Sequence, residues 1–437
     1  MLKEEQVEKF FHLAAAKTSV RQELIAGLTT FLAMIYIVPV NANIMSIAGM
    51  PFDALVTATA LITIIATLFN GLFANTPVAL SVGMGLNAYF TFALCVDAKM
   101  PWQSALGIVA ISGALFTVLS FTNFRVWVIK SIPLDLRRAI SAGIGAFICF
   151  IGLKQMGVIA PSQATLVTLG NLKDLNVLLG ILGLAVVLVL FVLRIKAAFI
   201  LSILITSCVA WVAGISPAPH GIVSAPSGIT PIFAKLDIPG ALKLAFVPFI
   251  ITFFVTHLFD SIGTLTGVGN RAGLFGENSK DGMKKLSRNL TSDAIGSVAG
   301  AVIGTSTVTA FAESASGVEA GGRTGLTAVF CAMFFVLTLF MLPLFKAIPA
   351  NAIYPILVMV GVLMFSELGK IDYSDAGILI PAFFIVFLMP FTYSITNGLS
   401  FGFIAYIVVR LAQRRIKDLN FGVLTLGFIS VLVFLMH

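Results

Sequence analysis

Apolar runs of about 17–25 residues, separated by short polar connections, recur along almost the whole chain. A transmembrane helix needs about 20 consecutive apolar residues, so each run predicts one membrane span. The predicted spans are Leu24–Met45, Ala54–Phe73, Thr76–Val96, Trp102–Phe121, Ala139–Ile159, Leu175–Leu193, Ala198–Ile215, Leu244–Val268, Thr291–Ile303, Gly304–Gly322, Leu326–Phe345, Tyr354–Phe365, Ala376–Pro390 and Ser394–Leu411. A further apolar run, Leu419–Met436, is compatible with an extra span or with an interfacial helix.

Two of these fourteen stretches are interrupted by small and polar residues. The third carries Gly83, Gly85 and Asn87 ahead of an apolar tail, and the tenth lies within a stretch rich in glycine, serine and threonine around one acid, Glu313. Non-helical backbone at membrane depth is tolerated only where it is buried in protein or lines a cavity. We expect Val308–Ala310 to be a short extended piece, and the segment beginning at Phe311 to be a half-helix with Glu313 in its first turn.

The two halves of the chain correspond in this pattern, because two spans precede the broken one in each. Seven spans per half is an odd number, so the second half is expected to be inserted in the opposite orientation. Paired interrupted segments at matching positions of two inverted halves indicate a transporter binding site.

The composition supports a membrane protein. The chain of 437 residues is 59% hydrophobic and only 11% charged, with a mean hydropathy of +1.05, whereas a soluble domain carries roughly 25% charged residues. We therefore predict an all-α polytopic membrane protein of about fourteen spans. The four cysteines lie within apolar segments without metal-ligand spacing, so no metal or cofactor is expected.

The formal net charge of +8 follows the predicted topology. With the N-terminus in the cytoplasm, 21 of the 27 lysines and arginines fall in the tails and even-numbered connections, as the positive-inside rule requires. The six others are Lys99, Lys154, Lys173, Lys235, Lys243 and Lys346. No nucleic-acid partner is needed to explain the charge. The first twenty residues are expected to form an amphipathic helix on the cytoplasmic face, and the charged stretch Asn270–Asn289 a solvated cytoplasmic loop.

Three ionisable residues inside the predicted spans are candidates for the chemistry, since such residues are costly in a membrane and by default functional. His257 and Asp260 are three positions apart and share a helix face. Burial disfavours the charged form of Asp260, which suits proton exchange. Glu313 can accept hydrogen bonds from adjacent N–H donors of a ligand. Asn87 offers donors and an acceptor. The residues expected to support the site through backbone or hydroxyl groups are Gly83, Gly85, Thr309 and Ser314.

The motifs GMGLNAYF, FDSIGTLTGV and TSTVTAFAESASGV resemble those of the AzgA-like purine permeases, a branch of the nucleobase–cation symporters. RQELIAGLTTFLAMIYIV, LRRAISAGIGAFI and PFTYSITNG fit the same family, so the resemblance covers essentially the whole chain. It implies the seven-plus-seven inverted-repeat fold of the uracil permease. The implied parts are an N-terminal segment at 1–23, a core domain at 24–122 and 241–347, and a gate domain at 123–240 and 348–437.

The resemblance also implies roles for individual residues. Asn87, in GLNA, would help to bind a purine, Glu313, in AES, would anchor it, and Asp260, in FDS, would couple transport to protons. His257 stands where the family often has aspartate, so it either contacts the substrate or shares a proton with Asp260. The expected substrates are adenine, guanine or hypoxanthine, carried by proton symport into the cell across the inner membrane. A homodimer is possible in this fold.

Three other functions remain as alternatives. An anion transporter of the same fold would favour a cation or backbone dipoles at the site, whereas this site carries Asp260 and Glu313. A membrane-embedded enzyme would need a catalytic cluster near the interface, and the sequence shows no HxxxD, metal-ligand or nucleophile arrangement. A channel would fail to show saturable, proton-dependent accumulation.

Overall fold

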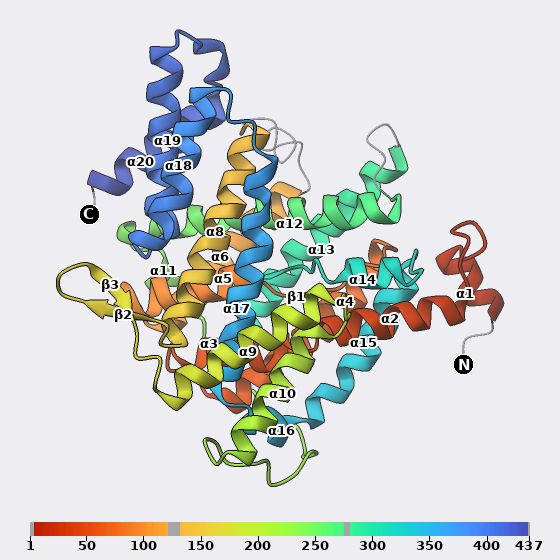
Figure 1. Ribbon diagram of the computed structural model, residues 1–437. Helices are drawn as coiled ribbons and strands as arrows, with labels where there is room; N and C mark the ends of the chain where they lie inside the picture. Colours follow the sequence, from red (N-terminus) through yellow and green to blue (C-terminus); the bar gives the residue numbers. More distant parts are fainter. Residues whose placement is uncertain (1–3, 121–131, 275–279, 436–437) are drawn as a thin grey trace.

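The computed structural model describes residues 4–120, 132–274 and 280–435, and helices account for most of them (Figure 1). The first half contains α1 Glu4–Phe11, α2 Val20–Met34, α3 Ile37–Ser46, α4 Phe52–Phe73, β1 Leu80–Val82, α5 Met84–Ala88, a π-helix Tyr89–Asp97, α6 Trp102–Ser120, α8 Leu134–Gln155, β2 Ile159–Ser162, β3 Leu166–Leu169, α9 Leu175–Val192 and α10 Ala198–Val212.

The second half again consists mainly of helices and contains one short strand, β4, among the described residues. It contains α11 Ile238–Ala241, α12 Val247–Ala272, α13 Lys280–Ile303, β4 Val308–Ala310, α14 Ser314–Glu319, α15 Gly325–Phe335, α16 Leu342–Ala347, α17 Ala350–Phe365, α18 Ala376–Phe391, α19 Ile395–Ala412 and α20 Phe421–Leu435. Short 3-10 turns lie at Leu244–Phe246, Val336–Phe340, Ser366–Lys370 and Ile416–Asp418.

Every predicted span coincides with a helix, a pair of helices or a strand followed by a helix. In the described part of the chain, eight helical stretches are long and apolar enough to cross a membrane. They are Val20–Ser46, Phe52–Phe73, Trp102–Ser120, Leu134–Gln155, Leu175–Val192, Val247–Gly269, Ala350–Lys370 and Ile395–Ala412. The full count of fourteen crossings stays a prediction, as does the position of α20 relative to a membrane.

The predicted loop at 270–289 is wrong over its second half. Helix α13 begins at Lys280, well before the predicted ninth span, and residues 280–289 are helical. Lys284 is exposed and Lys285 and Arg288 are half-buried, while Asn289 is buried, so one face of the extended helix packs on the protein. The Asn289 carboxamide oxygen accepts hydrogen bonds from Asn70 (2.9 Å) and Thr76 (2.7 Å). Residues 275–279 lie outside the described part, as do Lys3, Arg125 and Lys130 of the expected cytoplasmic set.

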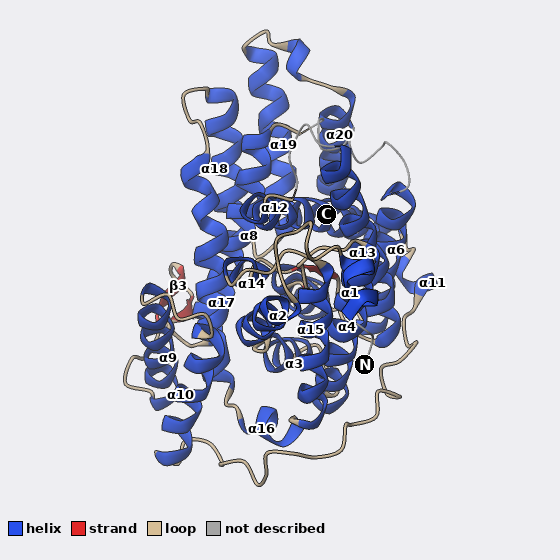
Figure 2. Cartoon of the chain, turned by 90° about the vertical axis from the view of Figure 1, so that its right-hand side faces the viewer, coloured by secondary structure: helices blue, strands red, loops and turns tan. Residues whose placement is uncertain are grey.

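The helices form two groups that differ in direction (Figures 1 and 2). In Figure 2, α17 and α18 run along the length of the picture on one side, whereas α2, α3 and α15 are seen nearly end-on on the other. Helix α8 packs against α17 and α18, and α15 packs against α2 and α4. The N-terminal helix α1 lies at the edge of the second group.

Small residues allow close helix packing within the first group. A side chain at Gly145 of α8 would meet the Gly361 carbonyl oxygen of α17 at 2.6 Å and the Phe365 nitrogen at 2.7 Å. Glycine at such a crossing lets two backbones approach closely, which is the usual way that helices associate inside a membrane. The pair therefore fixes the contact between α8 and α17.

Candidate functional site

The two broken stretches meet in a two-stranded antiparallel sheet. Strand β1 pairs with β4, and the register sets Ser81 opposite Thr309. The pairing is extended at both ends, because the Gly83 N–H donates to the Thr307 carbonyl (2.9 Å) and the Phe311 N–H donates to the Ala79 carbonyl (3.0 Å). The predicted extended piece Val308–Ala310 is thereby confirmed. Each strand satisfies backbone groups of the other, which allows non-helical chain in the interior of the fold.

Two of the expected supporting residues take part in this junction. The Ser314 hydroxyl accepts a hydrogen bond from the Ala79 N–H at 3.0 Å, so the start of α14 is tied to the chain ahead of β1. A side chain at Gly83 would lie 2.8 Å from the Thr309 Cγ2 atom. Glycine at position 83 therefore leaves room for Thr309 to pack directly on the opposite strand.

Glu313 lies in the turn between β4 and α14. Helix α14 begins at Ser314, so Glu313 is its N-cap residue and not a member of its first turn, because the backbone bonds around Glu313 (Ser314 N–H to the Phe311 carbonyl and Ala315 N–H to the Ala312 carbonyl) are three-residue turns. Its side chain is half-buried, and the neighbouring Ala312 is exposed. The Tyr36 hydroxyl, from the junction of α2 and α3, donates to Glu313 Oε1 at 2.5 Å. The carboxylate is thus held by Tyr36 and by its own backbone N–H, and no other residue is described as its hydrogen-bond partner.

Asp260 reaches β4 from helix α12. Its Oδ2 atom lies 3.4 Å from the Thr309 hydroxyl, and the neighbouring Ser261 hydroxyl lies 3.2 Å from the same group. The Asp260 side chain is half-buried. Thr309 therefore joins the aspartate of α12 to the middle of β4, while Glu313 follows the end of the same strand.

His257 contacts a different acid from the one expected. Its Nε2 atom lies 2.5 Å from Asp293 Oδ1 of α13, and both side chains are fully buried. The second oxygen of Asp293 accepts the Ala310 N–H at 3.1 Å, and the Phe116 ring packs edge-on against the imidazole. Positions 257 and 260 are about 60° apart around the helix, so they share a face, but each side chain contacts a different neighbour. The described hydrogen bonds of His257 therefore run to Asp293 and Ser297 of α13, whereas Asp260 contacts Thr309 of β4.

Asn87 belongs to a buried polar network. Its Nδ2 atom donates to Asn41 Oδ1 of α3 at 2.9 Å. Asn41 in turn donates to the hydroxyls of Thr59 (2.7 Å) and Thr305 (3.0 Å). Within the described structure, the Asn87 carboxamide oxygen is buried and has no hydrogen-bond partner, and a buried acceptor of this kind is available for a ligand donor.

Gly85 lies where the two helix groups touch. A side chain at this position would lie 3.1 Å from Ile144 Cγ2 and 3.3 Å from Ile148 Cδ1, both on α8. The absence of a side chain lets α5 sit closely against α8.

Sequence reasoning missed Tyr36, Asn41 and Asp293. Each is a polar or ionisable residue inside a predicted span, which is the signal that singled out Asp260 and Glu313. Asp293 is the clearest case, because an aspartate within Thr291–Ile303 needs a partner in an apolar environment. Among the described residues, no group of three or more histidines, cysteines or acids could hold a metal ion.

Comparison with known proteins identifies relatives along nearly the whole chain. A family model described as the Permease family matches residues 21–401. The adenine permease AdeP of Escherichia coli K12 is 42% identical, over 98% of this chain and 95% of its own length. The guanine/hypoxanthine permease PbuG of Bacillus subtilis is 37% identical, over 95% of this chain and 96% of its own.

Solved structures with a similar fold are more distant in sequence. The transmembrane domain of the cyanobacterial bicarbonate transporter BicA matches with a TM-score of 0.63 at 16% identity, covering 94% of this chain and 97% of that domain. Murine Slc26a9, an anion transporter in an inward-facing state, gives a TM-score of 0.63 at 11% identity, covering 90% of this chain and 68% of its own. At these identities the likeness extends to the fold alone.

Proposed function

Because the chain belongs to the Permease family, we propose that it imports purine nucleobases, adenine foremost, by proton symport. The chain is a multi-pass membrane transporter rather than an enzyme. The proposal of a purine substrate is supported by relatives that are adenine permeases at 42% identity and guanine/hypoxanthine permeases at 37–39%. The higher identity to the adenine permeases favours adenine.

Glu313 is proposed to anchor the purine. The observation that carries this role is its position: a half-buried carboxylate at the junction of the two broken segments, with Tyr36 as the only other residue described as its hydrogen-bond partner. A carboxylate has room for about four hydrogen bonds, so Glu313 keeps acceptors free for the edge N–H groups of a base. Asn87 is proposed to contribute its buried carboxamide oxygen to the same ligand.

Asp260 is proposed to carry the coupling proton. Its contact with Thr309 connects it to β4, so a change in its charge acts directly on the strand that leads to Glu313. His257 is proposed to assist through the Asp293 pair rather than through Asp260, because the imidazole already donates to or accepts from Asp293. Gly83, Gly85, Thr309 and Ser314 hold the two broken segments together and against α8.

We also propose a core domain (24–122 and 241–347) and a gate domain (123–240 and 348–437). The proposal further includes fourteen membrane crossings, a cytoplasmic N-terminus, an inner-membrane location and a homodimer. The packing of α8 with α17 and α18, and of α15 with α2 and α4, supports the division. Transport would proceed by movement of the core against the gate, with the purine held near Glu313.

Anion transport is less well supported. The solved structures with this fold include a bicarbonate transporter, but at 16% identity the likeness concerns the fold alone. Two half-buried acids, Asp260 and Glu313, beside one strand would repel an anion.

The test is uptake of labelled adenine by cells or proteoliposomes that contain the full chain. Saturable uptake that a proton gradient drives and a protonophore abolishes is expected. Unlabelled guanine, hypoxanthine, xanthine and uracil serve as competitors, and adenine should compete best. Uptake that is equal with and without the gradient contradicts symport, and competition by uracil alone contradicts the purine assignment.

The coupling role of Asp260 has its own test. Asp260→Asn removes the exchangeable proton but keeps an oxygen near the Thr309 hydroxyl. We expect this variant to bind adenine and to exchange it across the membrane, but not to accumulate it against a gradient. Wild-type dependence of uptake on external pH in this variant would contradict the assignment.

A further inference from the structure

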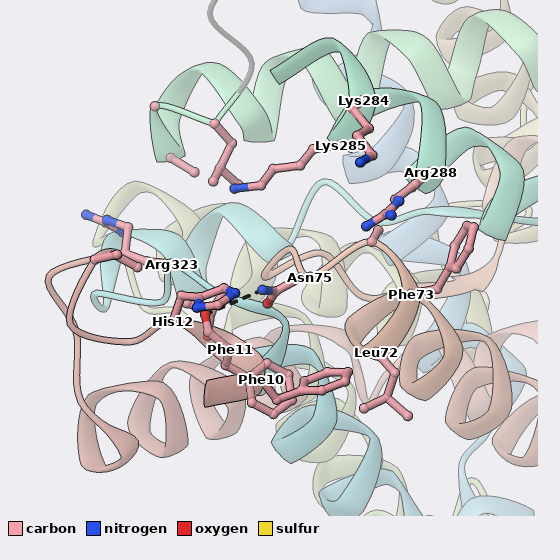
Figure 3. A pocket seen from close by; sticks show the side chains of 17 residues that line it. Phe10, Phe11, His12, Leu72, Phe73, Asn75, Lys284, Lys285, Arg288 and Arg323 are labelled. Atoms are coloured by element: carbon pink, nitrogen blue, oxygen red, sulfur yellow. Dashed lines mark hydrogen bonds between the residues drawn. The ribbon is translucent and has the colours of Figure 1, made fainter. Parts of the chain in front are cut away.

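A cavity of about 900 Å³ lies apart from the carboxylates of the proposed purine site, between the N-terminal segment and the first turns of α13 (Figure 3). It lies on the side that the charge pattern predicts to be cytoplasmic. The residues that line it are Phe10, Phe11, His12, Ala15, Ala16, Leu72, Phe73, Ala74, Asn75, Ala272, Gly273, Leu274, Lys284, Lys285, Arg288, Arg323 and Thr324.

The charged lining is of one sign. Lys284, Lys285 and Arg288 come from α13, and Arg323 comes from the segment after α14. Among the lining residues that the structure describes, none is an aspartate or a glutamate. Figure 3 shows the α13 side chains on one side of the cavity, with His12 and Asn75 across from them. Basic side chains gathered around one hollow give it a positive potential, which favours an anion there.

The wall of the cavity is fixed by hydrogen bonds from three segments. Asn75 has a left-handed backbone (φ 50°). Its side chain connects the segments of Phe11 and Gly325, because its Nδ2 atom donates to the Phe11 carbonyl (3.4 Å) and its Oδ1 atom accepts the Gly325 N–H (2.8 Å). The Arg323 guanidinium donates to the carbonyls of Val318 (2.7 Å) and Gly322 (2.8 Å). A pocket whose walls are already ordered loses little entropy on binding.

The cavity also has an apolar side that is open to its surroundings. Phe10, Leu72 and Phe73 are 52%, 45% and 38% exposed, although all three are large hydrophobic side chains. The Arg288 guanidinium lies 5.5 Å from the centre of the Phe73 ring, so the cationic and apolar sides adjoin. A ligand that suits both sides carries a negative group and a hydrocarbon part.

We propose that this cavity binds a phosphate group, and that an anionic phospholipid supplies it. The head-group phosphate would lie among Lys284, Lys285 and Arg288, and the acyl chains would cover the exposed side of Phe10, Leu72 and Phe73. A bound lipid would join the N-terminal segment to α13. Because α1 is held to the body of the protein mainly by Phe11 and Leu13 packing on Leu326, the lipid would add a second attachment for it.

The test is lipid binding by the purified full-length protein, measured by native mass spectrometry with phosphatidylglycerol and phosphatidylcholine. Wild type should retain phosphatidylglycerol with about tenfold higher affinity or more, because each basic residue near an anionic head group strengthens binding several-fold. The variant Lys284→Gln/Arg288→Gln should lose most of this preference. The control Lys9→Gln/Arg414→Gln, which removes two cations outside the cavity, should keep it.

A second variant separates charge from folding. Lys284→Arg/Arg288→Lys preserves both charges and should bind phosphatidylglycerol within about threefold of wild type. Equal retention of the two lipids by wild type, or an unchanged preference in Lys284→Gln/Arg288→Gln, overturns the proposal. A second experiment adds inorganic phosphate without phosphatidylglycerol, to distinguish a free phosphate from a lipid head group as the ligand. If it stabilises wild type but not Lys284→Gln/Arg288→Gln against heat, while phosphatidylglycerol does not, the assignment to a phospholipid is overturned.

Discussion

At the scale of single residues, Glu23 and Glu313 differ in how many hydrogen bonds their carboxylates accept from other residues. Glu23 of α2 is fully buried, and its two oxygens accept the backbone N–H groups of Arg323, Thr324 and Thr327 and the Thr327 hydroxyl. Glu313 is half-buried, and Tyr36 is the only other residue described as donating a hydrogen bond to it. A carboxylate accepts about four hydrogen bonds. Glu23 is therefore saturated and structural, whereas Glu313 has capacity left for a ligand.

Glu313→Gln is expected to weaken adenine binding by about tenfold or more, since hydrogen bonds to a charged group are worth about 1.5–3 kcal/mol and the variant also replaces one acceptor by a donor. Tyr36→Phe removes only the hydroxyl that orients Glu313 and should weaken binding less. Binding of labelled adenine to purified protein measures both. An unchanged dissociation constant in Glu313→Gln would rule out the anchoring role.

Glu23→Gln is expected to destabilise the protein without a specific effect on substrate affinity. Glutamine keeps one acceptor oxygen, but its amide nitrogen would face the N–H donors that Glu23 Oε2 accepts at present, namely those of Thr324 and Thr327. The loss should be about 2 kcal/mol or more. Thermal unfolding in detergent measures it, with Glu367→Gln at an exposed ion pair as the matched control. A control variant that unfolds as early as Glu23→Gln would contradict this account.

The His257–Asp293 contact predicts a strong coupling between two mutations. Removing one partner of a buried pair leaves the other unsatisfied, so His257→Gln and Asp293→Asn should each destabilise the protein. In the double variant the two amides can bond to each other, and the combined loss should fall below the sum by about 1–3 kcal/mol. Unfolding of the four proteins measures the coupling. The exposed pair Lys346–Asp53 is the control and should show additive effects.

At the scale of elements, the broken segments show what the sequence can predict. Val308–Ala310 was expected to be extended because small and β-branched residues interrupt the apolar pattern there, and the structure has β4 at this place. Its partner β1 was not expected, because the pairing joins residues more than two hundred positions apart and nothing local specifies it. His257 was assigned to Asp260 for the same reason: spacing along one helix is visible in a sequence, and a contact with α13 is not.

Gly83 gives a direct test of the β1–β4 junction. In Gly83→Ala, the new methyl group would lie 2.8 Å from Thr309 Cγ2, so one strand must shift, and we expect lower thermal stability and lower adenine uptake. Thr309→Ser removes that methyl group but keeps the hydroxyl near Asp260. The double variant Gly83→Ala/Thr309→Ser should therefore regain most of the loss. Failure of the double variant to recover would mean that the two residues do not pack against each other as described.

At the scale of the whole molecule, hydropathy located the helices well but not their partners. Each predicted span has its helix or strand, since a long apolar run has few other stable structures. The ends of the helices were less predictable where a helix continues through charged residues, as α13 does through Lys284 and Arg288, because a hydropathy pattern stops at such residues. The grouping of helices depends on side-chain contacts between distant segments, such as Gly85 with Ile144, and these carry no signal in a single sequence.

The contact between Gly85 and α8 is the place where the proposed movement of core against gate can be stopped. A Cβ atom at Gly85 would lie 3.1 Å from Ile144 Cγ2, so we expect cysteines at both positions to be close enough to form a disulfide. In a chain whose native cysteines are replaced by alanine, Gly85→Cys/Ile144→Cys should transport adenine when reduced and lose nearly all uptake when oxidised.

The matched control places a disulfide within one group of helices. A Cβ atom at Gly183 of α9 would lie 3.3 Å from Thr206 Cγ2 of α10, and both positions belong to the proposed gate. Oxidised Gly183→Cys/Thr206→Cys should therefore transport as the reduced form does, because its two helices move together. If oxidised Gly85→Cys/Ile144→Cys also transports normally, α5 and α8 do not separate during the cycle, and the boundary between core and gate must lie elsewhere. If oxidised Gly85→Cys/Ile144→Cys stops transporting while oxidised Gly183→Cys/Thr206→Cys remains active, the purine must cross by a movement of α5 relative to α8.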